Sequence, residues 1–230
     1  MDAGPQELSS DPPRRMPHTV EYNTSAGTAR LPGGRPAASQ GLEWLWQRLR
    51  DLQRPKVLDC GPVSPATLQI LLQRDAKFYA ADLITPLFNS DPKLWDHSGK
   101  IPVFLVKEFL NRLPTISEGS LEAIFCWNLF DLAPHDTLPE IAARFFALLQ
   151  PLGALFCILR EPQHPAGVER KWWLETLTSY ANESDAKKSF SYPPVTNREM
   201  ERLAAGASLK TFLTRSGRRE ILAVRPAPSA

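Results

Sequence analysis

Apolar positions along the chain follow two spacings, one typical of helices and the other of buried strands. From Leu42 to Leu52 they recur every three or four residues, which predicts a helix that ends before Pro55. Nearly continuous apolar runs follow at 56–61, 76–81, 121–127 and 154–159. Such runs are typical of parallel strands that helices cover on both faces. The pattern therefore predicts an α/β fold around a mostly parallel sheet.

Helix signals separate the predicted strands. Ser64 and Pro65 predict a helix start after the first strand, because serine caps helices and proline is favoured at the first helical position. A broad apolar stripe predicts a second helix at 138–149. The short apolar run at 103–106 is expected to form a further strand of the same sheet.

The last third of the chain predicts two helices followed by a hairpin. The helices are expected at 169–180 and 197–205, and the second begins with a capping box. Two apolar runs at 209–214 and 220–224 flank the turn sequence RSGRR, which predicts a β-hairpin. The predicted fold class is therefore a doubly wound, mostly parallel seven-stranded sheet with a C-terminal antiparallel β-hairpin.

Composition divides the chain at about residue 40. Residues 1–40 are rich in Pro, Gly, Ser and Thr and have almost no periodic apolar pattern. Such a segment cannot bury enough apolar surface to offset the entropy lost on ordering. We therefore expect a flexible N-terminal tail over 1–40 and one folded domain over 41–226.

Charge and cysteine usage limit the class of protein. The formal net charge of +2 is too small to favour nucleic acid or an anionic membrane as a partner. No apolar stretch is long enough to span a bilayer, and the N-terminus has no hydrophobic signal core. Cys60, Cys126 and Cys157 lie inside apolar runs without metal-binding spacing. We interpret them as core residues of a reduced, cytoplasmic protein.

The segment 198–225 is locally basic. Its charged residues are Arg198, Arg202, Lys210, Arg215, Arg218, Arg219 and Arg225 against Glu199, Glu201 and Glu220. The preferred interpretation is a solvated face, and the alternative is a site for an anionic partner.

The stretch KVLDCG at 56–61 carries the strongest functional signal. A buried strand that ends in an acidic residue and a glycine, just before a helix, is typical of the edge where open α/β sheets bind nucleotide-like ligands. Asp82 closes the second apolar run 21 residues after Gly61, and an acidic residue there can accept hydrogen bonds from both ribose hydroxyls.

The order of elements resembles that of the class I S-adenosylmethionine-dependent methyltransferases. The stretches that carry the resemblance are KVLDCG at 56–61, YAADL at 79–83, LEAIFCWNLFDL at 121–132 and RFFALLQPLGALFCIL at 144–159. The resemblance implies S-adenosylmethionine as a small-molecule cofactor and methyl transfer to an acceptor that the sequence does not identify.

The resemblance also implies a set of cofactor-binding residues at the strand ends. They are Asp59, Cys60, Gly61, Asp82, Leu83, Glu108 and Asn128. Asp59 and Gly61 would approach the amino-acid end of the cofactor and Asp82 would bind the ribose. The segment 107–109 would flank the adenine, and Asn128 would lie beside the sulfonium. Each polar member also has a simpler structural role open to it, as an acceptor for loop or turn amides or as an exposed helix-start carboxylate.

The loop after the first strand departs from the family's pattern of alternating glycines. It has Gly61, Val63 and Pro65, and Pro62 and Pro65 have no amide N–H to donate. Val63 is expected to crowd the path that glycine leaves open, so the loop predicts weak cofactor binding. His135 and Glu161 are candidate bases, but no catalytic residue can be assigned.

Three functions remain open from the sequence. The first is a methyltransferase, and the second is a non-catalytic protein that keeps the fold for binding or as a scaffold. The third, a nicotinamide-dependent oxidoreductase, is disfavoured because the loop GPVSP lacks the GxGxxG fingerprint.

Overall fold

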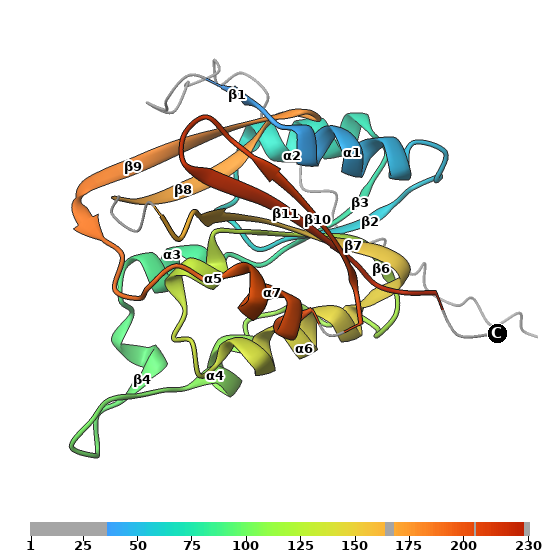
Figure 1. The fold of residues 1–230 in the computed structure, drawn as a ribbon. Coiled ribbons are helices and arrows are strands. Elements are labelled where there is room, and N and C mark those ends of the chain that lie inside the picture. Colours follow the sequence, from blue (N-terminus) through green and yellow to red (C-terminus); the bar gives the residue numbers. More distant parts are fainter. Residues whose placement is uncertain (1–35, 164–167, 205, 228–230) are drawn as a thin grey trace, which may run out of the picture. The chain divides into compact units, whose positions relative to one another are not determined.

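A computed structural model describes residues 36–163, 168–204 and 206–227. Its centre is a six-stranded sheet in the order β10-β11-β7-β6-β2-β3 (Figure 1). The strands are β2 (Lys56–Asp59), β3 (Lys77–Ala80), β6 (Leu121–Trp127), β7 (Leu149–Arg160), β10 (Ser208–Leu213) and β11 (Arg218–Val224). The first four run parallel, whereas β11 is antiparallel to both β7 and β10. The predicted mostly parallel sheet with a C-terminal antiparallel hairpin is therefore confirmed.

Helices cover both faces of the sheet (Figure 1). One face packs against α1 (Gln40–Leu49) and α2 (Pro65–Gln73), in a core that includes Leu45, Phe125 and Phe156. The other face packs against α3 (Ile84–Phe88), α4 (Val106–Leu110), α5 (Leu129–Leu132), α6 (Leu138–Leu148) and α7 (Asn197–Leu203). Because helices cover both faces, the parallel strands have few polar positions, which explains their nearly continuous apolar sequences.

The predicted strand at 103–106 does not join the central sheet. Only Val103–Phe104 is extended, as β5, and it pairs with β4 (Trp95–Asp96), which follows a 3-10 turn (Pro92–Leu94). Val103 and the preceding Ile101 are largely exposed, so this run lacks the two buried faces of a central strand. The predicted seventh strand is therefore wrong, and β3 is the edge of the sheet.

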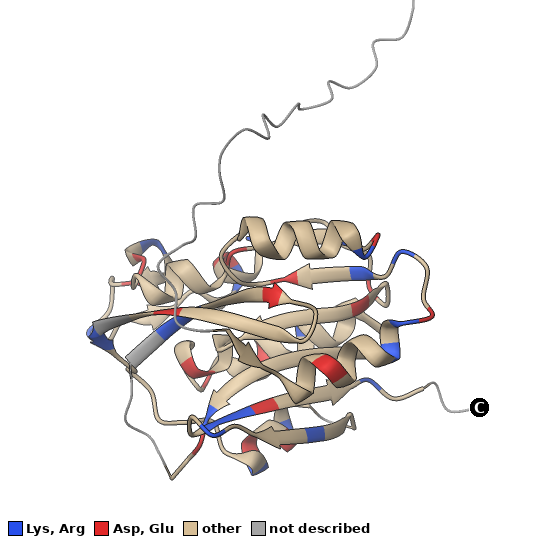
Figure 2. Ribbon diagram, turned by 90° about the horizontal axis from the view of Figure 1, so that it is seen from above, with Lys and Arg blue, Asp and Glu red and all other residues tan. Residues whose placement is uncertain are grey.

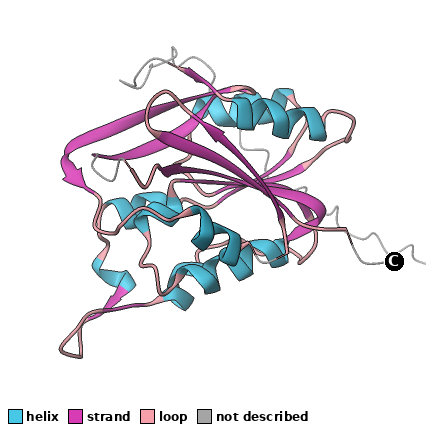
Figure 3. Ribbon diagram, viewed as in Figure 1, coloured by secondary structure: helices cyan, strands magenta, loops and turns pink. Residues whose placement is uncertain are grey.

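The predicted helix at 169–180 is also wrong. The chain there forms β8 (Val168–Thr176), which pairs antiparallel with β9 (Ser179–Ser189), and β9 pairs with the short β1 (Ala37–Ala38) (Figure 3). Aromatic and β-branched residues dominate this stretch and favour strands. The spacing of the aromatic residues fits a helix as well as a strand, and the chain forms the strand.

The folded part begins earlier than predicted. Ala37 and Ala38 pair with β9, and the Ser39 side chain caps α1 by accepting the Leu42 N–H at 3.0 Å. The boundary at residue 40 is therefore a few residues late, and residues 1–35 of the predicted tail lie outside the described part. No helix in the described ranges is both long enough and apolar enough to cross a membrane.

The basic segment near the C-terminus is not simply a solvated face. Acidic and basic residues are interspersed over the ribbon (Figure 2), but Arg218 and Arg219 at the start of β11 are buried. The interpretation of 198–225 as a solvated face is therefore wrong for these two residues.

Candidate cofactor site at the carboxyl edge of the sheet

The ends of β2 and β3 are held together beyond the last strand residues. The Ala81 N–H donates to Asp59 O at 2.9 Å, and the Leu83 N–H donates to Cys60 O at 3.0 Å. Asp82 therefore lies at the same sheet edge as Asp59, which is the ligand-binding edge of parallel α/β sheets.

Asp59 is a buried carboxylate at the centre of this edge. Its side chain is only 2% exposed, and its Oδ1 accepts the Gly61 N–H at 2.8 Å and the Trp127 indole N–H at 2.6 Å. Burial raises the pKa of Asp59 to about 6, and the nearby Asp82 charge adds to the increase, although both hydrogen bonds act against it. The ionisation of Asp59 is thus set by its burial, which opposes the charge, and by the Gly61 and Trp127 hydrogen bonds, which favour it.

Trp127, the last residue of β6, fills the space over Gly61. A Cβ atom on Gly61 would lie 2.7 Å from the indole ring, so no larger residue fits there. The ring is fully buried, stacks on Phe125 and meets Phe156 edge-on. Trp127 also has φ of 50°, in the left-handed region that is unfavourable for a bulky residue. Sequence reasoning missed this residue because a tryptophan in an apolar run predicts only core packing.

The other predicted residues at this edge have different environments. The Asp82 Oδ1 accepts the Thr85 N–H at 2.8 Å at the start of α3, and no other donor in the described structure reaches this half-buried carboxylate. Cys60 and Leu83 are completely buried in the core on the face of α6, so their side chains do not line a ligand site. Only the backbone atoms of these two residues can contact a ligand.

Asn128 is brought to the same edge but is covered by the β8–β9 hairpin. Its Nδ2 donates to Arg170 O of β8 at 3.0 Å, while its buried Oδ1 has no hydrogen-bond partner. The side chain lies at the start of α5, directly after Trp127. Asn128, which was expected beside the sulfonium, thus lies under β8, where the sequence predicted a helix.

The β8–β9 hairpin extends across the carboxyl edge from α2 to α3. Its Leu174 N–H donates to Thr67 Oγ1 in the first turn of α2 at 3.1 Å. At the other side, Lys188 donates to the Phe88 carbonyl at the end of α3. The hairpin therefore covers the helix N-terminus, where the family would bind the cofactor's amino-acid end.

Glu108 and Val63 are both exposed. Glu108 lies in the first turn of α4, as the alternative interpretation of an exposed helix-start carboxylate describes, and no contact described for it joins it to the acidic residues of β2 and β3. The Val63 side chain is 61% exposed, and the atoms nearest to a Cβ on Gly61 belong to Trp127 and Asp59. The obstruction above Gly61 is therefore Trp127, not Val63.

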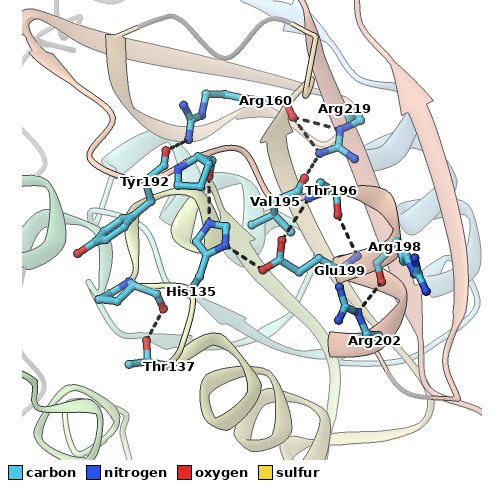
Figure 4. A network of polar contacts seen from close by, with 12 residues as sticks. His135, Thr137, Arg160, Tyr192, Val195, Thr196, Arg198, Glu199, Arg202 and Arg219 are labelled. Carbon is cyan, nitrogen blue, oxygen red and sulfur yellow. Dashed lines mark hydrogen bonds and ion pairs between the residues drawn. The ribbon is translucent and has the colours of Figure 1, made fainter.

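His135 belongs to a separate polar network, shown in Figure 4. Its Nδ1 lies 2.9 Å from Glu199 Oε1, and its Nε2 lies 3.0 Å from Pro193 O. Both ring nitrogens are therefore in contact with oxygen acceptors of the network, and the tautomer decides which of them donates. The network joins α7 to the loop before α6 beside a cavity of about 540 Å³. Of the two candidate bases, His135 is thus a structural residue in this conformation.

Comparisons with known proteins give similarity of fold only. No protein-family model matches the sequence, and no curated protein matches it. Among solved structures, the 1,6-didemethyltoxoflavin-N1-methyltransferase of Burkholderia thailandensis, crystallised with S-adenosylhomocysteine, is 18% identical, with a TM-score of 0.47 over 81% of this chain and 76% of that one. An S-adenosylmethionine-dependent methyltransferase of Mesorhizobium loti is 12% identical, with a TM-score of 0.46 over 80% of this chain and 98% of the other.

The fold assignment itself rests on this chain's own strands. Four parallel strands with intervening helices are followed by a hairpin whose last strand inserts antiparallel beside β7. This arrangement was expected from the resemblance of the sequence. The chain has the fold of the class I S-adenosylmethionine-dependent methyltransferases.

Proposed function

We propose that the carboxyl edge of β2, β3 and β6 binds S-adenosylmethionine and that the chain transfers its methyl group to an acceptor. The observation that carries the proposal is that Asp59, Asp82 and Asn128 lie at one edge of the sheet, where the Gly61 N–H donates to Asp59. Asp82 fits the ribose role, because one of its oxygens is not engaged by the described residues.

Trp127 is the feature that the proposal must accommodate. Its indole N–H donates to Asp59 in the position where the ammonium group of a cofactor could donate instead. We infer that cofactor binding moves this indole and the β8–β9 hairpin above it. The unfavourable φ of Trp127 supports a residue with a second conformation.

The bound cofactor would supply a methyl group made electrophilic by the sulfonium. The chain would contribute positioning: Asp82 would hold the ribose and Asp59 the amino-acid end, while the hairpin would exclude water. Methyl transfer requires mainly an in-line approach of the acceptor, which is consistent with the absence of an assignable base.

Calorimetric titration with S-adenosylmethionine and S-adenosylhomocysteine tests the proposal. Replacing Asp82 with alanine should weaken binding by about 1.5 to 3 kcal/mol, the scale of charge-assisted hydrogen bonds to the ribose. Asp96→Ala, which removes an exposed carboxylate of β4, is the matched control and should bind as the wild type does. Equal affinity of the Asp82→Ala variant and the wild type would remove Asp82 from the site.

A non-catalytic protein is the second candidate, and the burial of Gly61 under Trp127 favours it. In that case the indole would be a permanent part of the core. The wild type and the Trp127→Ala variant would then both fail to bind either ligand, whereas the first proposal requires binding by both proteins.

A further inference from the structure

Arg218 is a buried cation with a like charge opposite it. Its side chain is 7% exposed, and its register partner on β7 is Arg160, whose side chain is 3% exposed. Partners in an antiparallel ladder project from the same face, and like charges in such pairs are destabilising. The chain therefore pays a cost to keep two guanidinium groups at this end of the sheet.

The guanidinium of Arg218 lacks the polar partners that its neighbours have. It lies over the rings of Trp172 at 5.5 Å and Phe190 at 5.8 Å, and its buried Nη1 has no hydrogen-bond acceptor among the described residues. Arg219, the next residue, instead donates to the carbonyls of Arg160 and Val195 (Figure 4). One buried arginine is thus saturated with acceptors and the other is not.

The nearby buried carboxylates bind other groups. Asp131 Oδ2 accepts the Arg160 N–H at 2.8 Å and lies 3.5 Å from its Nε, while its buried Oδ1 has no hydrogen-bond partner among the described residues. Glu220 accepts the Gly41 N–H at 2.8 Å and the Tyr180 hydroxyl at 2.9 Å. Neither forms an ion pair with Arg218 in the described structure. Burial lowers the pKa of Arg218 to about 10, and the Asp131 charge partly opposes the decrease, so the guanidinium is still charged at neutral pH.

A second donor beside Arg218 also lacks an acceptor. The indole nitrogen of Trp172, whose ring lies under the guanidinium, is buried and without a hydrogen-bond partner. Arg170, two residues earlier on β8, is half-buried and adds positive charge near Arg218. Buried donors normally have acceptors, and a water molecule would satisfy a donor without compensating the charge.

We infer that Arg218 and Trp172 form a binding site for an anionic group, a carboxylate or a phosphate, beneath the β8–β9 hairpin. The hairpin supplies Trp172 and Arg170, and the sheet supplies Arg218 and Arg160. Entry of the anion requires the hairpin to lift, as does entry of the proposed cofactor. The anion would pair with the guanidinium of Arg218, with which no carboxylate of the described residues forms an ion pair.

The site adjoins the position proposed for methyl transfer. The Asn128 side chain donates to the carbonyl of Arg170, so the two regions share one residue of β8. Resting on the proposed function, we assign the anionic group to the methyl acceptor. The acceptor is then a carboxylic acid or a phosphate ester.

Thermal unfolding of the full chain in sodium phosphate, sodium acetate and sodium chloride, at matched ionic strength and pH 7, tests the site. Phosphate or acetate should raise the melting temperature of the wild type saturably and beyond chloride, because a ligand that binds only the folded state stabilises it. The anion that raises the melting temperature more identifies whether the site prefers a phosphate or a carboxylate. The apparent affinity should fall at least tenfold in Arg218→Met.

Two further variants make the result decisive. Arg215→Met removes an exposed arginine in the neighbouring turn and should respond as the wild type does. Trp172→Phe keeps an aromatic ring but removes the indole N–H, and it should reduce the rise in melting temperature that the anion causes. In chloride alone, Arg218→Met should melt at the wild-type temperature or above it, because it removes an uncompensated buried charge. If Arg218→Met does not fold, Trp172→Phe decides the outcome.

The outcomes separate this inference from the proposed function. Stabilisation by phosphate or acetate no greater than by chloride, or equal stabilisation of the wild type and the Arg218→Met and Trp172→Phe variants, would overturn the anion site even if S-adenosylhomocysteine binds. Arg218-dependent stabilisation without S-adenosylhomocysteine binding would support the anion site and remove the methyl acceptor as its ligand.

Discussion

Replacing Trp127 with alanine is expected to destabilise the protein and, at the same time, to tighten its binding of S-adenosylhomocysteine. The fully buried ring packs against Phe125 and Phe156, so its loss should lower the free energy of unfolding by about 3 to 5 kcal/mol. Its removal also uncovers Gly61 and frees Asp59 Oδ1. Because the ligand no longer has to displace the indole, the affinity should rise about tenfold or more.

Trp46→Ala is the matched control for this experiment. Trp46 is a buried tryptophan of α1 in the same aromatic cluster, 6.2 Å from Phe125 between ring centroids, and it has no contact with Gly61 or Asp59. The control should lose a similar amount of stability without any gain in affinity. Denaturant unfolding and calorimetric titration measure the two effects separately. A Trp127→Ala variant that is destabilised but binds no more tightly than the Trp46→Ala variant would mean that the indole does not block the ligand.

The sequence predicted the central sheet well because the signals there are redundant. Each parallel strand is a nearly continuous apolar run, and the intervening helices have stripes and caps that agree with one another. The C-terminal hairpin was equally clear from its turn sequence and two apolar runs. Its β11 then inserts beside β7, as the resemblance implied.

The failures occurred where local patterns were ambiguous or long-range packing decided the outcome. Trp172, Trp173 and Tyr180 fit a helix or a strand, and only pairing between β8 and β9 selects the strand. That error concealed the hairpin over the carboxyl edge, and with it the covering of Asn128. The burial of Arg218 was equally hidden, because a sequence of mixed charges predicts a solvated face unless the opposing strand is known.

The sequence predicted that the candidate residues share one edge of the sheet, but not the contacts that they make there. Asp59, Asp82 and Asn128 meet where the ends of parallel strands must meet, which follows from topology alone. The contact between Trp127 and Gly61 depends on a side-chain direction and a positive φ, neither of which has a signal in one sequence. For that reason the obstruction was assigned to Val63 instead.

Asp59→Asn is expected to increase stability at neutral pH and to remove a pH dependence that the wild type shows. The pKa of Asp59 is about 6 in the folded protein and 3.8 in the reference state, a difference of about 2.2 units. A raised pKa means that the folded state binds more protons between these values, so the stability of the wild type falls as the pH rises from about 4 to 6. At about 1.36 kcal/mol per unit, the full loss is about 3 kcal/mol.

Asparagine keeps the oxygen that accepts from Gly61 and Trp127 but carries no charge, so the variant should retain at pH 7 the stability that the wild type loses. The difference between the two proteins should grow from near zero below pH 4 to about 3 kcal/mol above pH 6. Asp131, whose pKa burial also raises, is present in both proteins, so its contribution cancels in that difference. Urea unfolding at a series of pH values measures the difference directly. If the two stability curves run parallel from pH 4 to 7, the Asp59 carboxyl is not held in its neutral form by burial. The Trp127 and Gly61 hydrogen bonds would then fully offset the cost of burying the Asp59 charge.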